Sequence, residues 1–517
     1  NTPIQQLACS KRLVLPLQMH IGEPARPEVG VGEHVGKGQR LARPDGFISA
    51  AIHAPTSGTV VAIESLPIPH PSGLSAPCIV IEADGEDRWE KPFEPWDDYQ
   101  SHTPLEIRQR LRDAGVVGLG GAVFPTAAKL AVPPDRPIKT LILNGAECEP
   151  YITCDDRVMR ERADQIIEGG RILLHASGAE RCLIGVEDNK PEAIASLQAA
   201  IKAAEDTRFE VVAVPTRYPA GGERQLILTL TGIEIPRNRH ATDYGLLCQN
   251  VATAASVYRA VVLGEPVISR VVTVTGEGIN RPGNFEVRIG TPISDVIAAA
   301  GGYKSGVDRL LMGGPMMGFA LADDTVPVVK ATNCLLALHP QDREPEQPPM
   351  PCIRCGQCAE ACPVNLLPQQ LYWYSRAKDL DRTREYHIFD CIECGVCAAV
   401  CPAHIPLVQY FRFAKTEIWA SERERLKANK ARERHKFHQE RIAREKAERE
   451  AMLAKKRAAL AAKQTNQSQT GSDKSAIKDE IAAAMARVKA RKAAAQTKKA
   501  SEPAQVGSPT YTESEKP

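Results

Sequence analysis

Residues 352–363 read CIRCGQCAEACP, and residues 391–402 read CIECGVCAAVCP. Both stretches have the spacing Cys-x2-Cys-x2-Cys-x3-Cys-Pro, so one chain carries the same cysteine module twice. Cysteine makes up 15 of the 517 residues. Three further cysteines would therefore follow a given one at these offsets by chance with a probability on the order of 3 × 10⁻⁵. The repeated spacing indicates a site that binds metal.

The spacing is that of bacterial ferredoxins, in which three cysteines of one motif and the last cysteine of the other hold each [4Fe–4S] cluster. Applied to this chain, the rule gives two ligand sets: Cys352, Cys355, Cys358 and Cys401 for one cluster, and Cys391, Cys394, Cys397 and Cys362 for the other. A pair of zinc sites with four thiolates each is the alternative, because zinc sites also use Cys-x2-Cys pairs. Zinc requires neither the third closely spaced cysteine nor the proline, so iron–sulfur clusters are favoured. Between the motifs, a segment with Leu and Tyr residues predicts helices beside the clusters.

The composition is that of a globular protein with several domains. The chain has 517 residues, 43% of them hydrophobic and 25% charged, whereas a single hydrophobic core stops growing at about 250–300 residues. No run of about 18 apolar residues occurs, and the first residues, NTPIQQLACSKRLVLPL, have no basic segment leading into an apolar one. We therefore expect neither a transmembrane helix nor a signal peptide. The clustering of cysteines favours metal binding in the reducing cytosol over disulfide bonds.

Residues 1–95 predict a small all-β domain. Short apolar runs alternate with Gly turns over residues 29–64, as in strands joined by tight turns. The phrases V-x-x-G-Q-x-L and A-P-x-S-G-x-V within this stretch resemble the barrel-sandwich fold of biotinyl and lipoyl carrier domains. The modified lysine of those carriers would lie in the hairpin between the two phrases, but ARPDGFISAA at 42–51 contains no lysine. A structural docking role is therefore favoured.

The remainder of the chain divides into further segments. Residues 100–265 alternate helical and strand-like segments, which predicts an α/β domain with a largely parallel sheet. Residues 266–330 predict two strands, a Gly/Pro turn and a helix, and resemble the β-grasp module of SLBB domains. A Pro-rich linker over 331–350 leads to the cysteine domain over 351–415, and a tail rich in Ala, Lys, Glu and Arg follows over 416–517. The predicted fold class is multidomain α/β with a charged tail, helical in part and disordered in part.

The tail is strongly basic. Residues 421–463 hold 15 Lys and Arg against 7 Glu, and pairs four residues apart such as Glu440 and Arg444 support a solvated helix. Disorder is expected through KQTNQSQTGSDKS at 463–475. A solvated helix is favoured, and attraction to anionic lipid or to a membrane partner is the alternative. Aromatic residues do not alternate with the basic ones, so we expect no nucleic-acid partner.

Several stretches of the α/β domain carry residues suited to a flavin or nucleotide. The glycine-rich GVVGLGGAVFPTAAKL (115–130) would let backbone N–H groups approach a phosphate or a flat ring. It is not a Walker A loop, since no Gly-Lys-Ser/Thr follows. LILNGAECEPYITCDDRV (141–158) ends a strand in polar residues, where ligands collect in parallel sheets. RYPAGGERQLI (217–227) predicts a tight turn, and LLCQNVATAASV (246–257) begins a helix.

In their order and spacing, these stretches resemble the FMN- and NADH-binding subunit of respiratory complex I, whose signatures are GRGGAGFPTGLKW, N-A-D-E-x-E-P, Y-I-C-G-E-E-T-A-L and N-N-V-E-T. The resemblance implies that FMN and its phosphate are held by Gly118, Gly120, Gly121, Lys129, Asn144, Asn250 and Thr253. It implies that the nicotinamide pocket is lined by Phe124, Glu149 and Glu223, with both glutamates as catalytic residues. The same stretches add the candidate cofactor-binding residues Glu147, Tyr218 and Gly221. Polar residues of the family are replaced by Leu119, Ala146, Gly222 and Ala252.

The order of all segments over about residues 10–415 resembles the RnfC family of the Rnf (Rsx) ion-translocating oxidoreductase complexes. The resemblance implies an NADH-dependent oxidoreductase subunit of a translocase, with FMN and two [4Fe–4S] clusters as cofactors and NADH as substrate. It implies membrane subunits of the same complex as partners, ferredoxin or another small electron carrier downstream, and a peripheral place on the cytoplasmic face of the bacterial inner membrane. A flavin fits this role because hydride transfer moves two electrons, whereas a cluster accepts one.

Two alternatives stay open. The related cobalamin reductases of microcompartments have the same parts, although the long basic tail favours RnfC. The other alternative is an electron relay or scaffold without flavin, in which the α/β domain serves only for docking. It rests on the replaced polar positions, and the absorbance spectrum of the purified chain distinguishes it.

Overall fold

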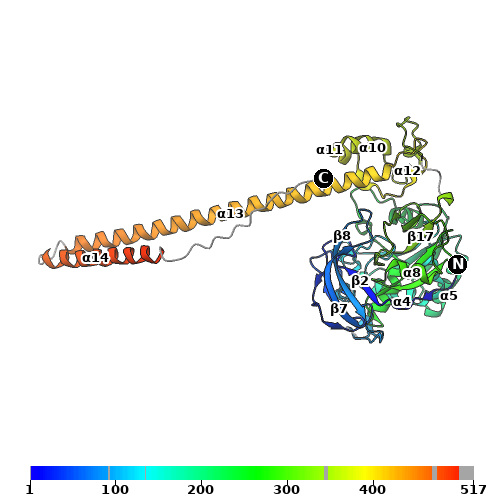
Figure 1. The fold of residues 1–517 in the computed structure, drawn as a ribbon, viewed down its shortest axis with the longest axis horizontal. Helices are drawn as coiled ribbons and strands as arrows, with labels where there is room; N and C mark the ends of the chain where they lie inside the picture. Colours follow the sequence, from blue (N-terminus) through cyan, green and yellow to red (C-terminus); the bar gives the residue numbers. More distant parts are fainter. Residues whose placement is uncertain (1, 91–92, 134, 343–346, 468–473, 500–517) are drawn as a thin grey trace. The chain divides into compact units, whose positions relative to one another are not determined.

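The computed structural model describes residues 2–90, 93–133, 135–342, 347–467 and 474–499. The chain forms two compact units, Asn1–Trp419 and Ala420–Pro517, which we describe in turn. Within the first unit a β-domain, an α/β domain, a β-grasp module and a helical cysteine domain follow one another along the chain (Figure 1). The predicted fold class is thereby confirmed.

The first domain consists of two small antiparallel sheets. Leu13 and Leu15 are completely buried, whereas Arg12 and Val14 are more exposed, as expected where one face of a strand packs on a core. The first sheet has the order β2-β8-β7-β4, formed by Arg12–Pro16, Ser75–Ala83, Gly58–Pro67 and His34–Val35. The second has the order β3-β5-β6, formed by Arg26–Pro27, Arg40–Arg43 and Ile52–His53.

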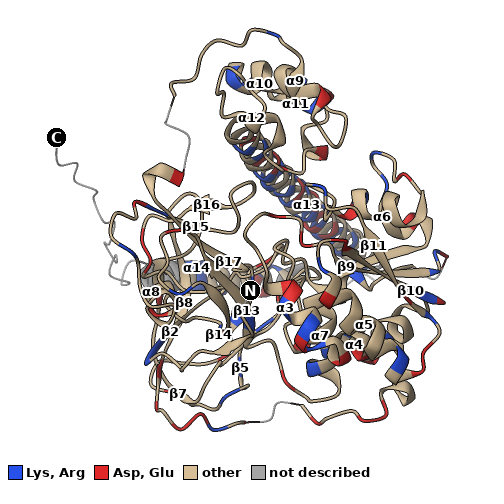
Figure 2. Ribbon diagram, turned by 90° about the vertical axis from the view of Figure 1, so that its right-hand side faces the viewer, with Lys and Arg blue, Asp and Glu red and all other residues tan. Residues whose placement is uncertain are grey.

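The α/β domain is built on a parallel sheet of order β11-β10-β9-β12. Successive residues of β9 face opposite sides, because Leu141 and Leu143 share a core with α4 while Ile142 packs with α6. Figure 2 shows α4, α5 and α7 on one side of this sheet and α6 on the other. The strands are Phe209–Val214, Arg181–Glu187, Thr140–Gly145 and Leu246–Asn250 in sheet order. The helices α1 to α7 are Pro104–Asp113, Thr126–Lys129, Cys154–Glu161, Ala163–Ser177, Pro191–Ala204, Glu223–Thr231 and Val251–Val261.

The β-grasp module is larger than the sequence predicts. Its sheet has the order β1-β14-β13-β17-β15-β16, formed by Gln5–Gln6, Gly283–Arg288, Ser269–Thr275, Cys334–Leu338, Arg309–Met312 and Phe319–Ala320, with α8 at Ile293–Ala299. All five residues of β17 are buried, between β13 and β15. The prediction of a linker over 331–350 is therefore wrong for the strand at 334–338. Five consecutive apolar residues form a central strand there, and the Pro-rich composition begins only after it.

The cysteine domain is made of short helices around a small apolar core that includes Leu371, Ile388 and Phe411. The long segment between the motifs is helical, as predicted. The helices α9 to α12 are Gln357–Glu360, Pro368–Ala377, Leu380–Glu385 and Val396–Ala399. The long helix α13 begins at Leu407 inside this domain, so the tail's helix starts earlier than the predicted boundary at 416.

The second unit holds the remainder of α13 (Leu407–Gln467) and α14 (Lys474–Lys499). The expected helix is confirmed over the described part of the tail, and ion pairs four residues apart join Lys436 to Glu440 and Arg441 to Glu445. The disorder expected at 463–475 falls partly on 468–473, outside the described residues. Among the helices that the structure describes, none combines the length and the apolar character needed to cross a membrane.

Candidate functional site

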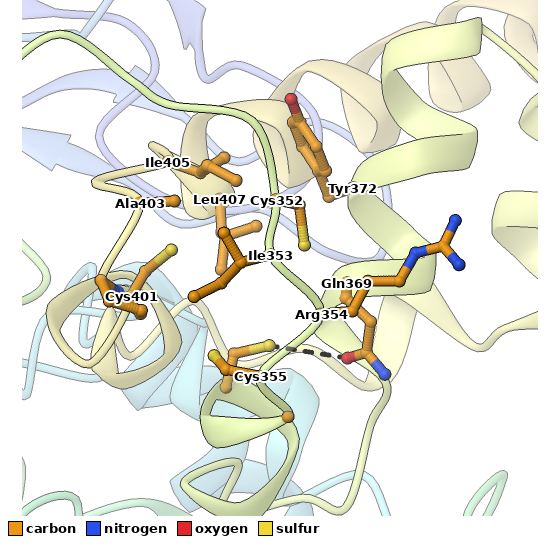
Figure 3. A pocket seen from close by; sticks show the side chains of 13 residues that line it. Cys352, Ile353, Arg354, Cys355, Gln369, Tyr372, Cys401, Ala403, Ile405 and Leu407 are labelled. Atoms are coloured by element: carbon orange, nitrogen blue, oxygen red, sulfur yellow. Dashed lines mark hydrogen bonds between the residues drawn. The ribbon is translucent and has the colours of Figure 1, made fainter.

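The four cysteines that the sequence assigns to the first cluster line one small cavity. Cys352 and Cys355 come from the loop before α9, Cys358 lies on α9, and Cys401 follows α12. Figure 3 shows Cys352, Cys355 and Cys401 around the cavity together with the apolar side chains of Ile405 and Leu407. The cavity wall is apolar apart from the sulfur atoms and the Arg354, Gln369 and Tyr372 side chains.

The other four cysteines line a second cavity. Cys391, Cys394 and Cys397 come from the second motif and Cys362 from the end of the first, so the motifs exchange their last cysteines. Leu371 and Phe411 are among the apolar residues that complete the wall. All eight thiols are free of disulfide bonds. Burial raises the pKa of the Cys397 thiol to about 12, and a metal ion is what keeps such a thiol deprotonated. Four sulfur ligands around each apolar hollow fit an iron–sulfur cluster.

The backbone repeats as well as the sequence. Each residue of the second motif follows its counterpart in the first by 39 positions, as Cys391 follows Cys352. Positive φ angles occur in both copies at corresponding residues, namely Arg354 and Glu393, Gly356 and Gly395, and Asn365 and His404. The short helices α9 and α12 also correspond. The repeated spacing therefore produces one chain path twice.

A much larger cavity, of about 720 Å³, lies in the α/β domain. Its volume is in the range of cofactor sites. Separate segments supply its wall: the glycine loop, the end of β9, the turn before α6, Asn250, the β-grasp module and, from the cysteine domain, Ile392. Of the candidate residues, those that line the cavity are Gly120, Gly121, Asn144, Glu147, Glu149, Tyr218, Gly221, Glu223 and Asn250.

The glycine loop turns back on itself at the edge of this cavity. The Gly118 N–H donates to the Phe124 carbonyl over 2.9 Å, and the Val123 N–H donates to Gly118 over 3.0 Å. At Gly120 a Cβ atom would lie 3.2 Å from the Asn250 amide nitrogen, so a larger residue there would require the Asn250 side chain to shift by a few tenths of an ångström. Gly118, Phe124 and Thr253 lie outside the cavity wall. Gly118 and Phe124 close the loop, and Thr253 accepts a 2.9 Å hydrogen bond from the Leu119 N–H.

The two asparagines brace the cavity wall. The Asn144 side chain donates to the Gly221 carbonyl over 2.8 Å and accepts from the Ala146 N–H over 3.1 Å. The Asn250 oxygen caps α7, and its amide donates to Asp155 over 2.6 Å. The polar groups of both residues are therefore engaged within the protein, and they hold β9, the turn and α7 together.

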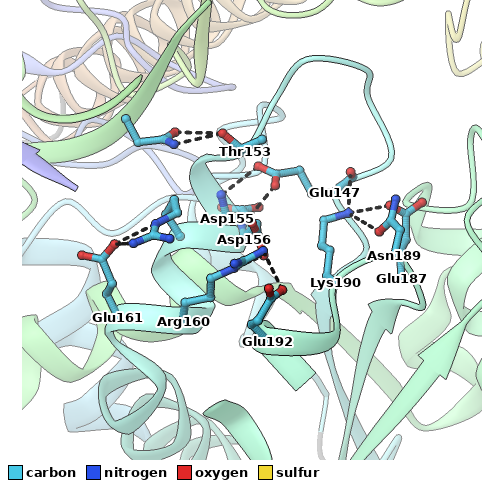
Figure 4. Close-up of polar contacts among 12 residues, drawn as sticks. Glu147, Thr153, Asp155, Asp156, Arg160, Glu161, Glu187, Asn189, Lys190 and Glu192 are labelled. Carbon is cyan, nitrogen blue, oxygen red and sulfur yellow. Dashed lines mark hydrogen bonds and ion pairs between the residues drawn. The ribbon is translucent and has the colours of Figure 1, made fainter. Parts of the chain in front are cut away.

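The Glu147 side chain lies beside the first turn of α3 (Figure 4). Its carboxylate oxygens accept hydrogen bonds from the Asp155 N–H over 2.8 Å and the Asp156 N–H over 3.1 Å. Burial and then the neighbouring Asp155 carboxylate raise the pKa of Glu147 to about 8. Burial also raises the pKa of Asp155. A carboxyl pair that cannot easily carry two charges thus forms part of the cavity wall.

Glu149 and Tyr218 connect the cavity to its neighbours. One oxygen of Glu149 accepts hydrogen bonds from the N–H groups of Met316 and Met317 over 2.7 and 3.0 Å. Burial raises the pKa of this carboxyl. The Tyr218 hydroxyl donates to the Cys394 carbonyl over 2.7 Å. One wall of the cavity therefore contacts the second cysteine site directly.

Lys129, which the resemblance assigns to the FMN phosphate, forms an ion pair within the protein. The Lys129 ammonium lies 2.7 Å from a carboxylate oxygen of Glu223, and Lys129 does not line the cavity. The basic residues in the wall are Arg224, Arg239 and His240, which sequence reasoning missed together with Asp155 and Ile392. Of these five residues, only Arg239 could have been suspected from the sequence, because its charge follows the predicted turn at 217–227. Nothing local distinguishes Ile392 from the equivalent Ile353.

Four family models match the chain. They are described as the RnfC barrel sandwich hybrid domain (residues 1–86), the Nuo51 FMN-binding domain (111–259), the SLBB domain (271–320) and a 4Fe-4S dicluster domain (351–405). These matches confirm the resemblances drawn from the motifs. They also favour iron–sulfur clusters over zinc in the cysteine domain.

Curated relatives match nearly the whole chain. The RnfC subunit of the ion-translocating oxidoreductase complex of Pseudomonas aeruginosa is 53% identical over 449 residues, covering 87% of this chain and 58% of the relative. The protein of the same name in Salmonella gallinarum is 48% identical over 497 residues, covering 96% of this chain and 71% of the relative. A crystal structure of an NAD+-reducing [NiFe]-hydrogenase in the H2-reduced state is similar over 62% of this chain and 65% of its own, at 19% identity and a TM-score of 0.44.

Proposed function

Since the chain belongs to the RnfC family of ion-translocating oxidoreductase complexes, we propose that it brings electrons into such a complex. In this proposal NADH is oxidised at FMN in the large cavity, and electrons pass singly through two [4Fe–4S] clusters toward the membrane subunits, coupled to ion translocation. The chain itself is a peripheral subunit on the cytoplasmic face of the membrane.

One observation carries the proposal. Ile392 lines both the large cavity and the second cysteine site. Tyr218 spans the same boundary with its 2.7 Å hydrogen bond to the Cys394 carbonyl, and the Gln225 side chain donates to the Pro363 carbonyl over 3.4 Å. A cavity of cofactor size and a thiol site for a cluster therefore share a wall, as an electron path requires.

Flavin, when bound, supplies the exchange between two-electron hydride chemistry and one-electron transfer. Gly120 and Gly121 of the glycine loop line the cavity, and because they carry no side chain, a phosphate or a flat ring can approach the backbone closely there. Gly118, Phe124 and Thr253 hold this loop in place. Asn144 and Asn250 keep the cavity open by joining its segments.

The acidic residues of the cavity are proposed to orient the dinucleotide. Glu149 and Glu223 lie on the wall, where a carboxylate can accept hydrogen bonds from ribose hydroxyls or the nicotinamide amide. The ion pair between Lys129 and Glu223 fixes the second of them. Glu147 has its own carboxylate engaged by α3, so its proposed role is to shape the floor of the cavity.

The test is the spectrum of the full chain after reconstitution with iron, sulfide and FMN. We expect flavin bands that bleach when NADH is added without oxygen, followed by loss of the cluster absorbance. Cluster absorbance without retained flavin would instead favour the relay without flavin. If oxidised cobalamin is added to the same samples and takes the electrons from the reduced flavin, the cobalamin reductase activity would be favoured.

A further inference from the structure

The repeat extends from the cysteine motifs into the helices that follow them. An offset of 39 positions carries the first residue of α10 onto the first residue of α13. Gln369 and Tyr372 on α10 line the first cysteine site (Figure 3). Their counterparts on α13, Val408 and Phe411, line the second site. The first turns of these two helices therefore form equivalent walls of the two sites.

The equivalent walls differ in polarity. On α10, the Gln369 side-chain oxygen lies 3.5 Å from the Cys358 sulfur. On α13, the corresponding wall consists of the apolar side chains of Val408 and Phe411. An iron–sulfur cluster acquires an additional negative charge on reduction, and apolar surroundings without hydrogen bonds to the sulfurs disfavour that charge. The α13 wall by itself therefore makes a cluster in the second site harder to reduce.

A buried lysine brings a positive charge to the second site. Lys415, one turn after Phe411 on α13, is 7% exposed, and its ammonium donates to the Cys391 carbonyl over 2.8 Å. The ammonium also lies 2.7 Å from one carboxylate oxygen of Glu393, whose other oxygen lies 2.8 Å from Arg412. Two cations against one carboxylate leave one positive charge in excess beside the motif.

The first site differs at the equivalent positions. Arg376 occupies the position of Lys415, but its side chain is exposed and donates to the Tyr372 hydroxyl over 3.2 Å. Arg354, the counterpart of Glu393, is exposed as well. Water and salt screen exposed charges, whereas a buried charge acts through a lower effective dielectric constant. The positive charge of Lys415 should therefore act on its site more strongly than either arginine acts on the first site.

We infer that Lys415 raises the reduction potential of the cluster in the second site by stabilising its reduced form. On reduction this cluster gains one electron and one negative charge, with no bond made or broken, and the ammonium held at the Cys391 carbonyl attracts that charge. In the proposed function, on which the inference rests for the electron donor, the electron comes from the reduced flavin in the large cavity. Lys415 thus offsets the effect of the apolar α13 wall.

The experiment is an anaerobic redox titration of the full chain with both clusters, with dithionite as reductant and EPR as readout. Cys355→Ser and Cys394→Ser assign the two signals. In Lys415→Met we expect the equilibrium constant for reduction of the second cluster to fall at least about tenfold, which corresponds to about 59 mV for one electron. Lys415→Arg keeps the charge and should stay within about threefold of the wild type.

Two further variants separate charge from structure. Arg376→Met, at the equivalent helix position, is the matched control and should change the constant for the first cluster less than about twofold, because that charge is exposed. Glu393→Gln keeps both cations and removes the carboxylate between them, so it should raise the constant for the second cluster at least about threefold. This variant decides the question if Lys415→Met does not retain its cluster, which iron and sulfide content measures.

The inference is overturned if Lys415→Met titrates like the wild type, or if Lys415→Arg shifts the potential as far as Lys415→Met does. It is also overturned if Arg376→Met shifts the first cluster equally, or if Glu393→Gln does not raise the potential of the second. Dithionite reduces the clusters without NADH or flavin, so these results do not depend on the proposed function. Failure of NADH to bleach the flavin in the same samples would reject the proposed function and leave the measured potentials valid.

Discussion

The two cysteine sites have the same spacing and the same chain path, yet one is enclosed and the other open. The second site shares Ile392 with the large cavity and is linked to it through Tyr218. The first site has the exposed Cys355 and Ile353 at its edge. The comparison teaches that a motif determines which thiols gather, whereas the packing around it determines the position of each site in an electron path.

The largest expected effect comes from removing one ligand of the enclosed site. Cys394→Ser should lose the second cluster and slow reduction of the remaining cluster by NADH more than about 100-fold, because the remaining site has no wall in common with the cavity. Iron content and the EPR spectrum after addition of NADH measure this. Cys355→Ser should leave the remaining cluster reducible, since that cluster adjoins the cavity. If the two variants behave alike, the enclosed cluster does not precede the open cluster in the electron path. Cys9→Ser, which removes a thiol outside both sites, is the control.

The next largest effect is expected from a substitution in the large cavity, which lies beside the enclosed site. Glu223→Gln removes the charge that pairs with Lys129 at 2.7 Å and should slow NADH-dependent flavin reduction about 10- to 100-fold. Both clusters should remain, because neither site contacts Glu223. Stopped-flow absorbance at the flavin bands gives the rate, and Glu234→Gln on the exposed surface serves as the control. Unchanged flavin reduction in Glu223→Gln would place the nicotinamide elsewhere in the cavity.

The carboxyl pair of Glu147 and Asp155 should make the stability of the folded protein depend on pH. A carboxyl whose pKa is raised in the folded state, to about 8 for Glu147, binds a proton more tightly there than in the unfolded chain. Stability should then fall as the pH rises from about 4.5 to about 8, by about 1–3 kcal/mol. Asp155, Cys154 and Lys190 also face this group, so Glu147→Gln should flatten the profile without abolishing it. Denaturant unfolding at pH 5.5 and 8.5 measures both, and an identical slope in the variant would contradict the assignment.

The smallest expected effect is a difference in stability between alanine substitutions at equivalent glycines of the two motifs. Gly356→Ala and Gly395→Ala both place a Cβ atom at positive φ, which costs about 1 kcal/mol. Gly395→Ala should cost more, because its Cβ atom would lie 2.8 Å from the Met316 carbonyl oxygen. Thermal unfolding of the cysteine domain in the two variants tests this. Equal destabilisation would show that the enclosed face is looser than its contacts indicate.

The ligand sets could be predicted from sequence because each depends on spacing within a repeat of one short segment. The cavity depends on residues that come together only after the domains form, such as Gly120 and Ile392, which line it from different domains, and local patterns carry no signal for such an arrangement. The resemblance to the complex I protein indicated the cavity's segments. It could not show that the amide groups of Asn144 and Asn250 are engaged by neighbouring protein groups.

The strand at 334–338 was missed for a different reason. Its run CLLAL is short and has no alternation, and a buried strand of this kind cannot be distinguished by periodicity alone. By contrast, β9, β10 and β11 of the α/β domain alternate with helices in a regular rhythm, which is why they were predicted. The fourth parallel strand, β12 (Leu246–Asn250), was not predicted, because its short run leads directly into α7.

The central claim is that electrons from NADH enter at the large cavity and reach the open cysteine site through the enclosed one. Anaerobic rapid mixing of the reconstituted chain with NADH, with freeze-quenched EPR samples referenced to Cys394→Ser and Cys355→Ser, tests it most directly. Flavin should bleach first, and the signal of the enclosed cluster should rise no later than that of the open cluster. If the open cluster is reduced first, or either cluster is reduced before the flavin, the path described above is contradicted.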